Sequence, residues 1–244
     1  MITRPTGKAA GPYEAAFLPR RQLVLRAPER PITDPVAKLG GDPVWLSEPT
    51  WPVDPCTKEP LVFIGQFPVP GDELRLAYLF LYEEGMIMGG LGPEDGDGVL
   101  LIQPGGRIPS SAEIGPPGTR GRTLWRYGPD WHSEIPVEWH LDLEPVSPEV
   151  DRSIDEQAAW ERSMRGEGPD VELPDGPELN DYLGGIACYP NLRAGIDAPW
   201  QFLFKIRDSC DGGDDPYFLN FGYGYGFGFV SPDHREGRFY WERS

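Results

Sequence analysis

The segment KLGGDPVWLSEPTWPVDPCTKEPLVFIGQF, at Lys38–Phe67, predicts how the chain is built, because a shorter version of it recurs at residues 182–206. The second copy begins as YLGGIACYP and continues, after a short gap, as PWQFLFKI. The two Leu-Gly-Gly triplets correspond, and Phe63 corresponds to Phe202. In both copies the triplet precedes an apolar run typical of a β-strand, and an acidic, glycine-containing turn follows that run. The sequence therefore predicts an internal duplication.

The composition favours strands joined by many turns. The 244 residues include 31 glycines and 29 prolines without a fixed period, and the eight tryptophans argue against disorder. We predict an α+β fold that is mostly β: internally duplicated antiparallel sheets forming one compact domain, with one clear helix in an acidic middle segment. The expected parts are an N-terminal extension with one strand (1–34) and a single domain (35–244), whose halves (35–128 and 182–244) flank an acidic helical insertion (129–181).

The helix is predicted from its start signals. Ser147 suits the N-cap, Pro148 suits the first helical position, and Glu149 and Asp151 favour a helix N-terminus. Glycine at position 166 ends the pattern, so the expected helix is Pro148–Arg165.

Negative charge is concentrated in the insertion. The chain carries a net charge of −17, and residues 129–181 hold 16 acidic residues against three arginines. Such a segment repels phosphate backbones, which argues against nucleic-acid binding, and it would steer a basic partner by long-range attraction. The alternative is a solvated insertion that only keeps the protein soluble.

The compartment expected from the sequence is the cytoplasm. No stretch reaches the roughly 18 apolar residues of a membrane span, and the N-terminus lacks the apolar core of a signal peptide. The three cysteines cannot all pair within the chain, so reduced thiols are the first interpretation. A Cys188–Cys210 bridge or an incomplete zinc site is the alternative.

Several motifs in order resemble the YwqG-like family, a bacterial domain of unknown function. They are KLGGDPVW with TWP following, PLVFIGQF, LAYLFLY, GGDDPYFLNF and a closing FYW, and they span Pro35 to Trp241. In the family pattern the stretch between the second triplet and its strand is usually longer; here Asn191–Ala198 is compressed. The resemblance implies a mostly β fold with internal duplication and supplies no established catalytic residues. The association of such domains with toxin–antitoxin and secreted-toxin systems implies an immunity-like role.

Aromatic residues are the main binding candidates. If Trp45 and Trp51 share a cleft with Tyr223, Tyr225 and Phe227, they would form a surface suited to cationic ligands or basic peptides. In the run GYGYGFGFV the aromatic side chains would share one face, and the glycines would leave the other face open to a backbone or a ligand.

Evidence for catalysis is weak. The sequence contains no HExxH, GxSxG, P-loop or dinucleotide-binding motif. Of the three histidines, His132, His140 and His234, the first two are interpreted as ordinary surface residues, and a metal or acid–base role for that pair is the alternative. The acidic turn with Asp211, Asp214 and Asp215 offers oxygen ligands for a divalent cation without EF-hand spacing, so no cofactor is expected beyond that possible cation. These carboxylates often populate turns for local reasons.

The sequence thus favours a non-enzymatic binding protein for a basic protein partner. Glu156, Glu161 and Asp170 would supply charge steering. Two alternatives stay open: a small-ligand or carbohydrate-binding β domain lined by Tyr223–Phe229, and a metal-dependent hydrolase that uses the acidic turn together with His234.

Overall fold

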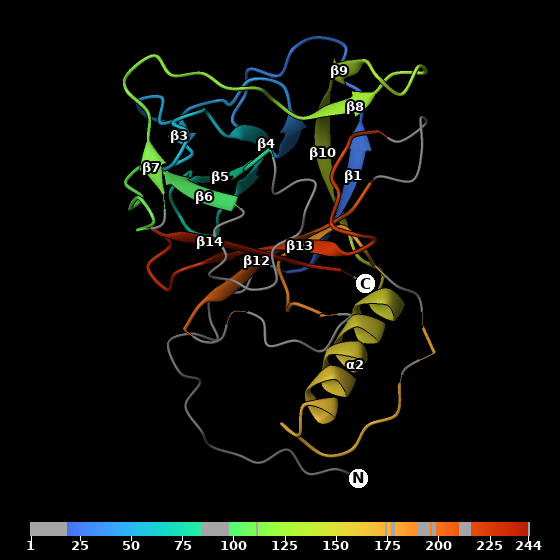
Figure 1. Cartoon of the computed structure of the whole chain (residues 1–244). Coiled ribbons are helices and arrows are strands. Elements are labelled where there is room, and N and C mark those ends of the chain that lie inside the picture. Colours follow the sequence, from blue (N-terminus) through green and yellow to red (C-terminus); the bar gives the residue numbers. More distant parts are fainter. Residues whose placement is uncertain are drawn as a thin grey trace.

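The computed structural model describes residues 19–83, 98–110, 112–173, 175–176, 179–189, 196, 199–209 and 216–243. This part of the chain is mostly β, with one helix, as predicted. Ten strands form an antiparallel sheet in the order β14-β13-β12-β11-β1-β10-β2-β4-β5-β6, and β3-β7 and β8-β9 form two small sheets (Figure 1). The outer strands β6 and β14 lie against each other, so the large sheet is nearly closed.

The elements run along the chain as β1 (Arg21–Arg26), β2 (Lys38–Gly40), β3 (Pro52–Val53), β4 (Val62–Pro68), β5 (Leu76–Leu81), β6 (Gly98–Gln103), β7 (Glu113–Ile114), β8 (Trp125–Tyr127), β9 (Glu134–Pro136), β10 (Glu138–Pro145), α2 (Pro148–Met164), β11 (Tyr182–Leu183), β12 (Gln201–Arg207), β13 (Tyr225–Val230) and β14 (Gly237–Glu242).

The ten-stranded sheet has the same arrangement of strands on the two sides of its centre. β1 pairs with β10 at the centre, and each then pairs with a short strand that carries a Leu-Gly-Gly triplet, β11 beside β1 and β2 beside β10. On each side the order continues through three more antiparallel strands. Leu39 pairs with Gly65 in one half, and Leu183 pairs with Phe204 in the other.

Both halves carry the same irregularity. The register between β4 and β5 shifts between Phe63 and Gly65, and the register between β12 and β13 shifts between Phe202 and Phe204. A β-bulge at matching positions is a specific feature rather than a random defect. These are the positions that the alignment of the two sequence copies pairs.

The glycines of the triplets have backbone conformations that side chains rarely adopt. All four have positive φ angles, at Gly40, Gly41, Gly184 and Gly185. A Cβ atom at Gly40 would lie 2.0 Å from the carbonyl oxygen of Val137, so the triplet lets β2 approach the start of β10 closely.

The first strand lies at the centre of the sheet, whereas the sequence predicted an extension before the domain. Leu23 pairs with Leu143 and Leu25 with Leu141, and Leu23 and Leu141 belong to the buried core. The sequence pattern of Arg21–Arg26 identifies a strand but does not identify the strands that pair with it. Those strands, β10 and β11, lie more than a hundred residues further along the chain.

Helix α2 begins as predicted. The Ser147 side chain accepts a hydrogen bond from the Val150 N–H, Pro148 follows, and the helix ends before Gly166, whose φ is +76°. Its inner face packs Ile154 and Ala158 against Cys188. No helix in the described part of the chain has the length and apolar character needed to cross a bilayer.

The helix is also held by Arg20, the residue just before β1. The Arg20 guanidinium, with a buried side chain, forms ion pairs with Asp151 and, at 3.0 Å, with Asp155. Two of the acidic side chains on α2 are therefore partly neutralised within the chain.

Candidate functional site

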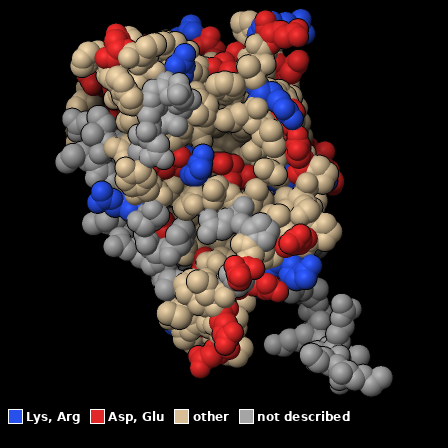
Figure 2. Space-filling view, turned by 90° about the vertical axis from the view of Figure 1, so that its right-hand side faces the viewer, with Lys and Arg blue, Asp and Glu red and all other residues tan. Residues whose placement is uncertain are grey.

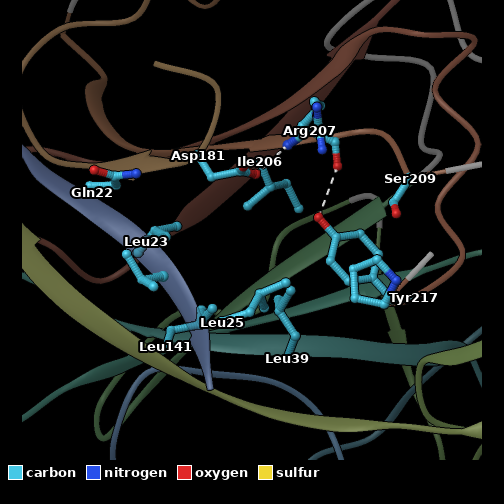
Figure 3. A pocket seen from close by; sticks show the side chains of 12 residues that line it. Gln22, Leu23, Leu25, Leu39, Leu141, Asp181, Ile206, Arg207, Ser209 and Tyr217 are labelled. Carbon is cyan, nitrogen blue, oxygen red and sulfur yellow. Dashed lines mark hydrogen bonds between the residues drawn. The ribbon is translucent and has the colours of Figure 1, made fainter. Parts of the chain in front are cut away.

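A cavity of about 210 Å³ lies between the central strands and β12 (Figure 3). Leucines of β1, β10 and β2 form one wall, which we call the leucine wall, and Ile206 and Tyr217 face it. Strand alternation explains this wall, because Leu23 and Leu25 share a face of β1. The lining residues are Gln22, Leu23, Val24, Leu25, Leu39, Leu141, Asp181, Ile206, Arg207, Ser209, Pro216 and Tyr217.

Polar groups gather along one edge of this cavity. Oδ1 of Asp181 accepts a hydrogen bond from the Arg207 N–H at 2.7 Å, and the Asp181 carbonyl oxygen accepts one from the Leu23 N–H at 2.9 Å. The Tyr217 hydroxyl donates to the Arg207 carbonyl oxygen at 3.2 Å, as Figure 3 shows. Burial raises the pKa of the Asp181 carboxyl, and the hydrogen bond from Arg207 opposes that change. Hydrogen bonds to β1 and to β12 therefore hold Asp181 in place at this edge.

The described lining combines an apolar wall with few polar groups. The described lining contains one carboxylate and one serine but no histidine or cysteine that could activate a nucleophile. An apolar wall with a few fixed polar groups is typical of a small-ligand site.

The predicted aromatic residues lie on separate halves. Trp45 stacks on Tyr78 at 4.9 Å between ring centroids and contacts Trp51 edge-on at 6.3 Å, in a cluster on the first half. Trp51 is buried, and its indole N–H donates to the Leu61 carbonyl at 2.7 Å. Phe227 and Tyr225 belong to another cluster, on the second half. The expected shared cleft is therefore not formed, because each set packs against the outer face of its own strands.

The glycine run is only partly extended. Tyr223 is 69% exposed with φ of +66°, so it lies outside β13. The face left bare by the glycines is filled from within the domain: a Cβ at Gly226 would meet Phe239, and one at Gly228 would meet Phe204. That face is packed by aromatic rings and is not open to a ligand.

The three predicted steering carboxylates differ in position. Glu156 and Asp170 are exposed. Glu161 is only 2% exposed; its carboxylate accepts hydrogen bonds from the Tyr189 N–H at 2.7 Å and from Gln157 at 3.3 Å. Burial raises the pKa of Glu161 to about 7. It lies on the inner row of the helix, against the segment that contains Cys188 and Tyr189, so its carboxylate is not presented to a partner.

An acidic surface nevertheless covers α2 and the segment after it. Figure 2 shows red side chains over the lower part of the molecule, where α2 lies in Figure 1, as well as along its right-hand edge and at its top. We call this region the α2 surface. Its exposed acidic residues are Glu149, Asp151, Asp155, Glu156, Glu167, Asp170, Glu172 and Asp175.

The predicted metal ligands Asp211, Asp214 and Asp215 lie outside the described residues, as does Cys210. Within the described residues no group of three or more His, Cys, Asp or Glu side chains is placed to hold a metal ion. His234 Nε2 lies 3.0 Å from the Gln201 amide oxygen. Cys56 is exposed as a free thiol, and burial raises the pKa of the Cys188 thiol to about 12.

Sequence reasoning missed the central cavity. Its polar residues Asp181 and Arg207 stand in no recognisable motif. They meet because β11 pairs with β12, and the leucine wall lies beside them because β1 pairs with β11. Scans against protein-family models, curated proteins and solved structures found no match for the chain.

Proposed function

We propose that this is a non-enzymatic binding protein whose α2 surface engages a basic protein partner. The proposal includes an immunity- or antitoxin-like role in the cytoplasm and membership of the YwqG-like family with an internally duplicated chain. The observation that carries it is the combination of exposed carboxylates with exposed apolar side chains on one continuous segment.

The charge on this segment is only partly neutralised by the chain itself. Arg20 pairs with two helix carboxylates, and Arg165 pairs with Glu167 at 3.0 Å. Among the described residues, Glu156, Asp170 and Glu172 take part in no ion pair. Such carboxylates raise the rate at which a basic partner arrives, because their field extends for about a Debye length, roughly 8 Å at physiological salt.

Apolar side chains on the same segment can supply contact energy. Met164 is 57% exposed and Leu173 is 59% exposed, and Val171 lies between the acidic residues Asp170 and Glu172. Apolar side chains surrounded by charge match the pattern of an interface with a basic, amphipathic segment. This pairing replaces the buried aromatic residues that the sequence suggested for affinity.

Affinity capture tests the proposal. The tagged protein is incubated with lysate of its own source at low and at high salt, beside a variant with Glu156→Lys, Asp170→Lys and Glu172→Lys. A matched control reverses three exposed acidic residues on the first half, Glu48→Lys, Glu59→Lys and Asp72→Lys.

We expect a basic protein that the native chain and the control retain at low salt and release at high salt, and that the α2 variant loses. Retention of the same protein by all three chains would contradict the role of the α2 surface. Recovery of no specific protein would contradict the proposed partner class.

A further inference from the structure

We propose that the central cavity binds a phenol-sized molecule, with its apolar ring against the leucine wall and a hydrogen-bond donor directed at the Asp181 carboxylate. This inference is independent of the partner proposed for the α2 surface, which lies on a different part of the chain.

The volume of the cavity sets the size of the ligand. About 210 Å³ of space beside the central strands, partly open to solvent, can admit a small molecule. An apolar cavity of about 150 Å³ suffices to bind benzene. The cavity therefore accommodates one ring with a small substituent, and it is too small for most drug-sized ligands.

The wall determines that the bulk of the ligand is apolar. Leu23, Leu39, Leu141 and Ile206 line it, and each belongs to the buried core. They come from β1, β2, β10 and β12, which pair through backbone hydrogen bonds in one sheet. The wall is thus formed in advance of binding, and this preorganisation reduces the entropy cost of holding a ligand.

The polar edge determines the functional group. One Asp181 oxygen is already bonded to the Arg207 N–H, which fixes the carboxylate at the cavity edge beside Ile206 (Figure 3). A carboxylate has several acceptor sites and no donor when it is ionised, so it can accept another hydrogen bond. A ligand hydroxyl supplies that donor.

The test compares phenol with toluene, which has the same number of heavy atoms but no hydroxyl. Binding of each to the full chain is measured by NMR titration of backbone amide signals, with the Leu23 and Arg207 signals as reporters of the cavity. Asp181→Asn keeps the shape and an oxygen that can accept from Arg207, but its amide nitrogen no longer offers an acceptor to phenol.

We expect both compounds to shift the signals of lining residues in the native chain. Asp181→Asn should weaken phenol binding by about tenfold, because a hydrogen bond to the carboxyl group is lost, and should leave toluene binding within about twofold. Leu25→Phe should fill the cavity and weaken both compounds, whereas Leu173→Phe, on the α2 surface, should change neither.

Absence of shifts at the cavity with either compound would overturn the site. Equal effects of Asp181→Asn on phenol and toluene would overturn the assignment of the donor to this carboxylate. Both of these outcomes are measured on native and Asp181→Asn protein, so the test is decisive even if Leu25→Phe does not fold.

Discussion

The substitution Gly40→Ala tests whether the Leu-Gly-Gly triplet allows two strands to approach closely. Gly40 has a φ angle of +65°, a conformation that costs an alanine roughly 1 kcal/mol. In addition, the new Cβ would lie 2.0 Å from the Val137 carbonyl oxygen, which accepts a hydrogen bond from the Gly41 N–H at 2.9 Å. β10 must shift to relieve this contact, so we expect a total loss of at least about 3 kcal/mol in the free energy of unfolding.

Gly166→Ala is the matched control, because Gly166 has a similar φ of +76° and no atom within 4 Å of an added Cβ. It should cost only the conformational term, about 1 kcal/mol. Urea denaturation of the three proteins, followed by tryptophan fluorescence and analysed by linear extrapolation, measures the difference. Equal losses for the two variants would refute the close approach at Val137.

Two further predictions concern buried charge. Glu161 has a pKa of about 7, above its ordinary value, so the folded state favours the protonated form; its contribution to stability is present below about pH 4.5 and is lost as the pH rises through 7. Glu161→Gln should remove up to about 3 kcal/mol of this pH dependence between pH 5 and 8, and an unchanged profile by thermal or urea unfolding would contradict the burial of this carboxyl. Lys38 is fully buried and its ammonium lies 2.7 Å from Glu138, so Glu138→Gln should destabilise the chain by about 3 kcal/mol, since it leaves a buried charge unpaired. The double variant with Lys38→Met should recover part of that loss, and simple additivity in urea unfolding would count against the ion pair.

Much of the fold could be predicted because its signals are local. The apolar run after the first triplet predicted β4, and Ser147 with Pro148 predicted the start of α2. Side chains buried on both faces explain why β4 and β5 are almost continuously apolar rather than alternating.

What could not be predicted depends on distant contacts. The central place of β1 follows from pairing with strands far along the chain. The burial of Glu161 follows from the docking of α2 beside Tyr189, although the helical row that contains Ile154 already points to the inner face. The cavity joins six separate segments, so no single stretch of sequence carries its pattern.

The most direct test of the proposed function is the association rate of a captured basic partner, measured against ionic strength by surface plasmon resonance. The account predicts that the rate for the native chain falls steeply as salt rises, and that reversing Glu156, Asp170 and Glu172 lowers it about tenfold or more at low salt and flattens the dependence. An association rate that is unchanged by the reversals, with the same dependence on salt as the native chain, would contradict it.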